Sequence, residues 1–252
     1  MIETRALTKR YGAITVVDNV SVTIPVGGLT SIIGPNGAGK STFMMLISRL
    51  LPATSGSVTV DGMDVATTPT GTLAKRLAIL RQDNHTGARL SVGDLVAFGR
   101  YPHSKGRLTL EDHDHVERAL RYLEITPLRE RFIDELSGGQ RQRAFIAMVL
   151  CQDTDYLLLD EPLNSLDLKH AAATMKILRR AADELGKTVV LVLHDINFAS
   201  CYSDHIIAMR AGRVMLEGPP AGVMQTGPLG ELYEMNIDIH ELRGRRVMTY
   251  YG

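Results

Sequence analysis

The chain has 252 residues, of which 44% are apolar and 22% charged, which supports one large folded domain, or one domain with a subdomain, around a true hydrophobic core. Its 28 basic and 28 acidic side chains cancel, so no charge surplus points to nucleic acid or to an anionic lipid surface. No apolar run approaches the roughly 20 residues that span a bilayer, so any membrane role is expected to be peripheral. We also expect no secretory signal, and buried reduced thiols at Cys151 and Cys201.

Apolar periodicity predicts strands first, then a helical block, then strands again. An alternating strand begins with Ile2, Thr4 and Ala6, and Asp61-Gly62 marks a later turn. The other strands are expected at residues 16–24, 29–33, 57–60, 77–80, 156–159, 188–193, 206–209, 214–216 and 247–251. Helices are expected at residues 41–51, within 91–152, at about 170–185, and in the tail after Pro219. The short unbroken apolar run at 156–159 is typical of a strand buried on both faces.

Residues 34–41 read GPNGAGKS and lie between an expected strand and an expected helix. Gly34, Gly37 and Gly39 can adopt positive φ, which lets the main chain wrap closely around phosphate oxygens. The N–H groups of such a loop and of the following helix point at the anion. Lys40 then places a positive charge against the terminal phosphates, and Ser41 offers its hydroxyl to Mg²⁺. The motif therefore predicts a nucleotide phosphate site.

Two carboxylates follow the buried run at 156–159. Successive side chains on a strand point to opposite faces, so Asp160 and Glu161 are expected to have different roles. Asp160 can reach the shell of Mg²⁺, whereas Glu161 can face an attacking water and accept its proton. Such general-base assistance is typically worth about 10²- to 10⁴-fold in rate.

A second anion-binding element is predicted at residues 136–140, which read LSGGQ. Ser137 is expected to cap a helix from Gly138 to about Gln152. A cap does not explain two glycines in the first turn, where each costs up to roughly 1 kcal/mol against alanine. Bare N–H groups at a helix N-terminus form an anion site, and the chain therefore carries two such elements about a hundred residues apart.

With these motifs in this order, nearly the whole chain resembles the ATPase subunit of ATP-binding cassette transporters. GPNGAGKS is similar to the Walker A loop of that family, LLLDE to Walker B and LSGGQ to the signature motif. Gln82 resembles the Q-loop glutamine, residues 165–167 the D-loop, His194 the switch histidine, and Tyr11 the aromatic residue that stacks on adenine. Leu163 and Asn164 depart from the commoner threonine-containing form, and we expect catalysis not to depend on them.

The resemblance implies an α/β fold, with a P-loop NTPase core of ABC ATPase type, an antiparallel β subdomain and an inserted α-helical subdomain. It implies a single ABC ATPase domain over residues 1–252. Within it, a RecA-like core with the β subdomain is expected at 1–82 and 153–235, a helical subdomain with the signature motif at 83–152, and a C-terminal tail at 236–252.

The resemblance also implies a head-to-tail dimer of two copies of the chain, with ATP and Mg²⁺ between the Walker A loop of one copy and LSGGQ of the other. It gives catalytic roles to Glu161, His194 and Gln82, and metal contacts to Ser41, Gln82 and Asp160. The residues expected to bind the nucleotide are Tyr11, Gly34, Pro35, Asn36, Gly37, Ala38, Gly39, Lys40, Ser41, Thr42, Ser137, Gly138, Gly139, Gln140 and Asp167.

The stretch between Gln82 and Leu136 has room for a compact helical subdomain but not for a long coiled coil. Residues 90–103 resemble the region after the Q-loop in importers of iron–siderophore, haem and vitamin B12. Residues 161–170 and 194–204 resemble ferric-siderophore ATPases, especially the catecholate type. These resemblances imply a peripheral protein on the cytoplasmic face of the membrane, which docks a transmembrane permease on about residues 83–103 and serves a siderophore-binding protein indirectly, with no nucleic acid.

Two alternatives remain open: the same motor with haem, vitamin B12 or another metal chelate as cargo, and a regulatory ATP-binding module without productive turnover. A metal site made by His85, His103, His113 and His115 is not expected. His113 and His115 are two residues apart, so on a helix they do not share a face.

Overall fold

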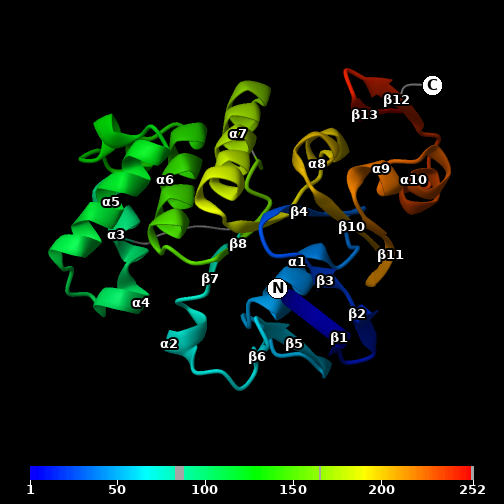
Figure 1. The fold of residues 1–252 in the computed structure, drawn as a ribbon, viewed down its shortest axis with the longest axis horizontal. Coiled ribbons are helices and arrows are strands. Elements are labelled where there is room, and N and C mark those ends of the chain that lie inside the picture. The colour runs from blue at the N-terminus through cyan, green and yellow to red at the C-terminus, as the bar shows by residue number, and fades with distance from the viewer. Residues whose placement is uncertain (83–87, 165, 251–252) are drawn as a thin grey trace. The chain divides into compact units, whose positions relative to one another are not determined.

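The computed structural model describes residues 1–82, 88–164 and 166–250 (Figure 1). The chain forms two compact units, one made of Met1–Thr68 with Thr188–Gly252 and the other of Pro69–Lys187. Within the described parts of the chain, no helix combines the length and the apolar character needed to cross a bilayer.

The first unit contains a largely antiparallel sheet with the order β2-β1-β5-β6, in which β3 also pairs with β1. Its strands are β1 (Ile2–Tyr11), β2 (Ile14–Val20), β3 (Thr23–Ile24), β5 (Ser55–Val60) and β6 (Met63–Asp64). Two expectations for this region are wrong. The alternation in β1 fails at Ala6, which is exposed with a φ of 47°, and residues 16–24 form two strands rather than one. The hydroxyl of Ser21 accepts the Ala6 N–H at 2.8 Å, so a side chain replaces the ladder bond where the strands break.

The same unit contains a second sheet, in which β11, β10, β4 and β9 are neighbours in that order. The strands are β4 (Gly28–Ile33), β9 (Thr188–Val192), β10 (His205–Arg210) and β11 (Arg213–Gly218). Strand β4 runs parallel to both β9 and β10, and β10 forms the predicted hairpin with β11. All five residues of β9 are buried, so this sheet forms the core of the unit.

Helix α1 (Lys40–Ile47) follows β4, and α8 (Ile196–Tyr202) follows β9. Helix α1 ends four residues before the predicted end at residue 51. The hydroxyl of Ser48 donates a hydrogen bond to the Met44 carbonyl at 3.0 Å. Arg49 then adopts a φ of 59°, and this left-handed conformation ends the helix. Cys201 lies on α8 beside its buried face and is partly exposed, so the prediction of a buried thiol is wrong there.

The tail has more structure than the sequence predicts. It forms α9 (Pro220–Val223), α10 (Thr226–Tyr233), and a hairpin of β12 (Asp238–Leu242) and β13 (Arg245–Thr249). The hairpin packs on α8. The Asn197 side chain accepts the Met248 N–H at 2.7 Å and donates to the Met248 carbonyl at 3.2 Å. Strand β12 has no buried residue, which explains why its hydrophobic pattern gave no strand signal.

The second unit combines a parallel strand pair with a group of helices. The strands are β7 (Leu77–Leu80) and β8 (Tyr156–Asp160), and every residue of β8 is buried, as predicted. The α-helices are α2 (Thr70–Leu73), α3 (Val92–Phe98), α4 (Tyr101–Ser104), α5 (Leu110–Tyr122), α6 (Gly138–Cys151) and α7 (Leu168–Leu185), and two short 3-10 helices cover Thr126–Leu128 and Ile133–Glu135. Helices α3, α5 and α6 pack against one another (Figure 1).

Local capping fixes where these helices begin. Ser91, Thr109 and Ser137 each form a capping box at the start of α3, α5 and α6. The predicted cap of Ser137 on a helix starting at Gly138 is therefore confirmed. Cys151, at the end of α6, is buried as predicted, and burial raises the pKa of its thiol to about 12.

Candidate nucleotide-binding site

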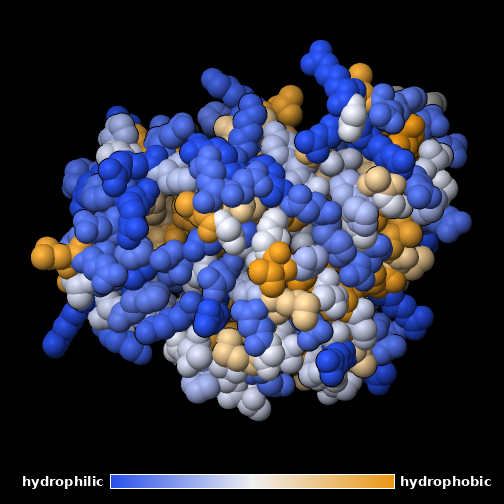
Figure 2. Space-filling view, viewed as in Figure 1, coloured by the Kyte–Doolittle hydropathy of each residue, from blue (hydrophilic) through white to orange (hydrophobic). Residues whose placement is uncertain are grey.

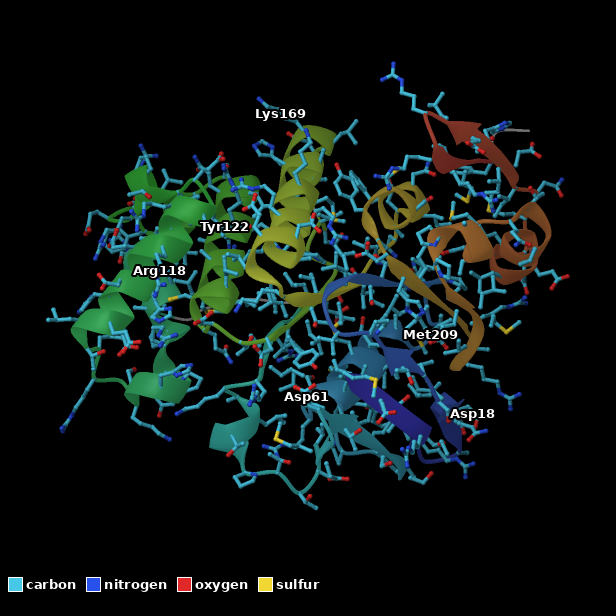
Figure 3. The ribbon with its side chains drawn as sticks, viewed as in Figure 1. Asp18, Asp61, Arg118, Tyr122, Lys169 and Met209 are labelled. Carbon is cyan, nitrogen blue, oxygen red and sulfur yellow. The ribbon has the colours of Figure 1, made fainter. Side chains whose placement is uncertain are left out.

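The phosphate loop connects the buried end of β4 to the start of α1. Gly34, Gly37 and Gly39 have φ values of 142°, 77° and 94°, so the predicted positive φ is confirmed at all three. A β-carbon on Gly34 would lie 2.0 Å from the carbonyl oxygen of Met209, which is labelled in Figure 3. One on Gly39 would lie 2.5 Å from the Val16 carbonyl oxygen. The loop therefore needs glycine both for its conformation and for its close approach to the sheet.

Lys40 is 5% exposed, and its ammonium donates to the carbonyls of Gly34 at 2.8 Å and Pro35 at 3.0 Å. The loop thus curls around a buried cation at the N-terminus of α1. Asn36 and Gly37 form the exposed tip, whereas Ala38 is buried. Ser41 and Thr42 in the first turn of α1 are partly exposed. A buried ammonium beside helix N–H groups suits the oxygens of a phosphate chain.

His194 lies at the same edge of its sheet as the phosphate loop. Strands β4 and β9 are parallel neighbours, and the Leu193 N–H donates to the Ile32 carbonyl at 3.1 Å. The loop follows β4 and His194 follows β9, so both stand at the carboxyl ends of adjacent strands, where α/β sheets bind ligands. The side chain of His194 is exposed.

Tyr11, at the end of β1, is 49% exposed, and the Lys9 ammonium lies 5.1 Å from its ring centroid. The cation covers part of an otherwise accessible aromatic surface. Tyr11 therefore offers a flat surface on which another ring could stack.

The second unit brings Gln82 and Glu161 together. Strands β7 and β8 are parallel, with Leu80 opposite Leu159, so the residues that follow them reach one edge. Gln82 Nε2 donates to Glu161 Oε2 at 2.8 Å. Asp160 is 6% exposed, whereas Glu161 is partly exposed with a φ of 51°, so the two carboxylates have different surroundings.

The structure also brings Asn164 to this carboxylate, which the sequence did not predict. Asn164 Nδ2 donates to the same Glu161 Oε2 at 3.0 Å. Two amide N–H groups therefore hold one carboxylate oxygen and restrict its orientation. Asn164 departs from the commoner family pattern and was expected to be dispensable, and only a three-residue spacing from Glu161 could have indicated this contact.

The LSGGQ segment presents its polar groups to solvent. The Ser137 hydroxyl accepts the Gln140 N–H at 3.4 Å, and Gln140 Oε1 accepts the Ser137 N–H at 3.1 Å. Ser137 and Gly138 are exposed, and Gly139 and Gln140 are partly exposed.

Asp167 caps α7 and is exposed. Its Oδ1 accepts the backbone N–H of His170 at 2.8 Å and the ring Nδ1–H at 2.8 Å. The backbone N–H first, and the ring second, hold the pKa of the Asp167 carboxyl below its usual range. Residue 165, part of the expected D-loop, lies outside the described residues.

The oxygens expected to contact Mg²⁺ are the Ser41 hydroxyl in the first unit and the Gln82 amide and Asp160 carboxylate in the second. Hard oxygen donors of this kind suit Mg²⁺. Among the described residues, no three His, Cys, Asp or Glu side chains gather in a metal-binding group.

Within the segment expected to receive a permease, about residues 83–103, some of the described side chains are buried and others are exposed. A β-carbon on Gly99 would lie 2.1 Å from the Met148 carbonyl oxygen of α6, and Arg100 is 4% exposed. Phe98 and Tyr101 are 54% and 59% exposed. A depression of about 390 Å³ is lined by Leu90, Asp94, Ala97, Phe98, Tyr101, Ser104, Gly106 and Leu108. Residues 83–87 of the expected permease site, and with them His85, lie outside the described residues.

The positive-φ phosphate loop on a parallel sheet and the acidic end of a second parallel strand define an α/β P-loop nucleotide-binding protein. Residues 17–164 match the ABC transporter family model. The chain therefore belongs to the ABC transporter family, as an ATP-binding ATPase, and the resemblance seen in its motifs is confirmed.

Known relatives match this chain over most or all of its length. The chain is 50% identical over 252 residues to the petrobactin import ATP-binding protein YclP of Bacillus subtilis (strain 168), covering 100% of both chains. It is 42% identical to the ferric enterobactin transport ATP-binding protein FepC of Escherichia coli (strain K12), over 92% of this chain and 87% of that one. A dimeric ATP-binding cassette solved in a post-hydrolysis state with ADP and Pi is 29% identical, with a TM-score of 0.77, over 87% of this chain and 99% of that chain.

Proposed function

We propose that this chain is the ATP-hydrolysing subunit of a bacterial importer for ferric siderophores and works on the cytoplasmic face of the membrane with a separate permease. The observation that carries the proposal is the Glu161 carboxylate, held on one oxygen by Gln82 and Asn164 at the end of a buried strand. A fixed carboxylate of this kind is what general-base activation of a water requires. The 50% identity to a petrobactin import ATP-binding protein supports the siderophore cargo.

In this proposal the phosphate loop binds the triphosphate through its N–H groups and Lys40, and Tyr11 stacks on the adenine. Ser41, Gln82 and Asp160 hold Mg²⁺, which when bound neutralises charge on the phosphate oxygens. Glu161 orients the attacking water and takes its proton. His194, at the sheet edge that carries the phosphate loop, holds the terminal phosphate.

We further propose that two copies of the chain assemble head to tail. The LSGGQ segment, which is exposed at Ser137 and Gly138, and the exposed Asp167 then face the nucleotide on the second copy. The dimeric ADP-bound relative supports this arrangement. The proposed domain plan keeps the RecA-like core and β subdomain at 1–82 and 153–235, the helical subdomain at 83–152 and the tail at 236–252.

The permease is proposed to dock at the depression beside Phe98 and Tyr101. The depression is lined by apolar side chains, such as Leu90, Phe98 and Leu108, with polar side chains between them, and such a lining suits the apolar face of a partner helix. Figure 2 shows a mainly hydrophilic surface with scattered hydrophobic residues, including a small group at the left edge of the view, where Figure 1 draws helices of the second unit. Haem, vitamin B12 and other metal chelates remain the alternative cargoes, because cargo is selected by the binding protein and permease.

Glu161→Gln tests the hydrolytic role. The variant should bind ATP with unchanged affinity and hydrolyse it about 10²-fold or more slowly, because the amide cannot accept the proton of the water. Glu130→Gln, which replaces a side chain that is 88% exposed in the same unit, is the matched control and should retain turnover. Undiminished hydrolysis by Glu161→Gln would refute the role of Glu161.

Uptake of ferric siderophore, haem and cobalamin by the reconstituted transporter would identify the cargo.

A further inference from the structure

His170 lies in the first turn of α7 and contacts two other functional segments of its unit. Lys169, labelled in Figure 3, marks this turn. The His170 ring donates through Nδ1 to the Asp167 carboxylate at 2.8 Å, and the His170 backbone N–H donates to the same oxygen at 2.8 Å. On its other side the ring lies against Gly139, at the start of α6. A β-carbon built on Gly139 would lie 2.7 Å from Cδ2 and 2.9 Å from Cγ of His170.

This contact explains a glycine that the capping pattern left unexplained. Gly139 is the second residue of α6 and has no positive φ, so its backbone does not require glycine. Alanine would favour the helix at this position. The space taken by the His170 ring is therefore what excludes a side chain from position 139.

The His170 ring cannot move away from a larger residue at position 139 without losing its hydrogen bond to Asp167. The Cβ atom of His170 would also lie 3.3 Å from the carbon added to Gly139, so the contact involves the base of the His170 side chain as well as its ring. A rotation about χ1 would relieve the contact but would break the bond from Nδ1 to Asp167. The orientation of Asp167 and the space beside Gly139 are thus set by one ring.

We propose that His170 is a positioning residue that joins the signature segment at residues 137–140 to the cap of α7 at Asp167, so that the two segments move together. The effect of this link on turnover rests on the proposed function, in which both segments face the nucleotide on a second copy of the chain. The mechanical link itself does not depend on it, since it lies within one unit of one chain.

The link is tested first by thermal unfolding of the nucleotide-free protein. Gly139→Ala should lower Tm by about 2–10 °C, the range expected for one over-packed contact in a protein of this size. In the His170→Ala background the same change should leave Tm unchanged or raise it by up to about 4 °C, because alanine favours the helix once the ring is gone. Gly71→Ala is the matched control, since Gly71 is the second residue of α2 and has nothing within 4 Å of its added carbon. An equal fall in Tm in both backgrounds overturns the proposal.

Turnover supplies the second test. His170→Ala should lower kcat about 10-fold or more with the KM for ATP within twofold, because it misaligns residues without removing a nucleotide contact of its own copy. His170→Asn keeps an N–H donor near the Nδ1 position and should regain most of the lost kcat. Wild-type kcat in His170→Ala, or no difference between the Asn and Ala variants, would refute the positioning role of His170 in turnover, while the mechanical link is decided by the Tm comparison. An active Glu161→Gln enzyme would instead refute the proposed function and leave the Tm result standing.

Discussion

The buried ion pair between Arg100 and Asp112 provides a test of how the helical part of the second unit is held together. Arg100 Nε donates to Asp112 Oδ1 at 2.8 Å, with both side chains at most 6% exposed. A second nitrogen of Arg100 donates to the Cys151 carbonyl at 3.0 Å, at the end of α6. Asp112 Oδ2 accepts the N–H of Thr109 at 3.0 Å and its hydroxyl at 2.9 Å, which caps α5. Two side chains therefore tie the start of α5 to the end of α6.

Asp112→Asn removes the charge and leaves the guanidinium of Arg100 buried without its counter-ion. Breaking a buried pair in this way costs about 3–5 kcal/mol. The bond from Arg100 to Cys151 remains and asparagine can still accept one cap bond, so we expect a loss near the lower value, about 3 kcal/mol. That loss is a large part of the 5–15 kcal/mol typical of a folded domain.

Urea unfolding followed by circular dichroism at pH 7 measures this loss as a lower midpoint with an unchanged slope. Asp114→Asn, an exposed position on the same helix, is the control and should stay within about 0.5 kcal/mol of wild type. A loss below about 1 kcal/mol for Asp112→Asn would show that Arg100 finds solvent or another partner, and would refute the reasoning.

The pH dependence of the same comparison has a definite sign. The Thr109 N–H first, and Arg100 second, hold the pKa of Asp112 well below its ordinary value of 3.8. A carboxyl with a depressed pKa contributes stability above its unfolded pKa and loses it as pH falls toward the folded pKa. The free energies of unfolding of wild type and Asp112→Asn should therefore differ by a constant amount above about pH 5 and converge below about pH 4. A gap at pH 2 as large as the gap at pH 7 would contradict this assignment.

Three further changes test other contacts. Asn164→Ala should lower kcat by about 10-fold with ATP binding intact, because Glu161 loses the amide donor that Asn164 supplies, and wild-type phosphate release would show that this bond is not needed for turnover. Gly34→Ala should abolish nucleotide binding measured by calorimetry, because the added carbon would lie 2.0 Å from a backbone oxygen, and retained affinity would contradict the loop geometry. Asn197→Ala should speed proteolysis of the tail, because both bonds to the Met248 backbone disappear, and an unchanged cleavage rate would mean that the hairpin is held elsewhere.

The sequence predicts the parts of the fold whose signals are local. Strand β8, the cap of α6 at Ser137 and the hairpin of β10 and β11 were all predicted from short windows. The break in β1 was not, because Ser21 makes the bond that replaces the ladder at Ala6, and no window contains both. Strand β12 was not predicted either, because it buries no residue and depends on its pairing with β13.

In the candidate site, too, contiguous motifs are predicted from the sequence, whereas contacts between separate segments are not. The phosphate loop is predicted because its glycines, lysine and serine are contiguous and each has a chemical reason. The bond from Asn164 to Glu161 and the contact of His170 with Gly139 are not predicted, because they depend on how the chain turns after β8 and where α7 begins. Residues close together in a motif are read from the sequence, whereas the side chains that hold them in place are found only in three dimensions.

The two units place their functional groups by the same rule. In the first, parallel strands β4 and β9 carry the phosphate loop and His194 at their carboxyl ends, and in the second, parallel strands β7 and β8 carry Gln82 and Glu161. Parallel pairing makes all carboxyl ends in a sheet coincide, so residues distant in sequence meet without any contact that motif spacing could encode. The proposed phosphate-binding group and the proposed water-activating group are therefore each positioned by the pairing of two buried strands, and the residues that follow those strands would supply the chemistry.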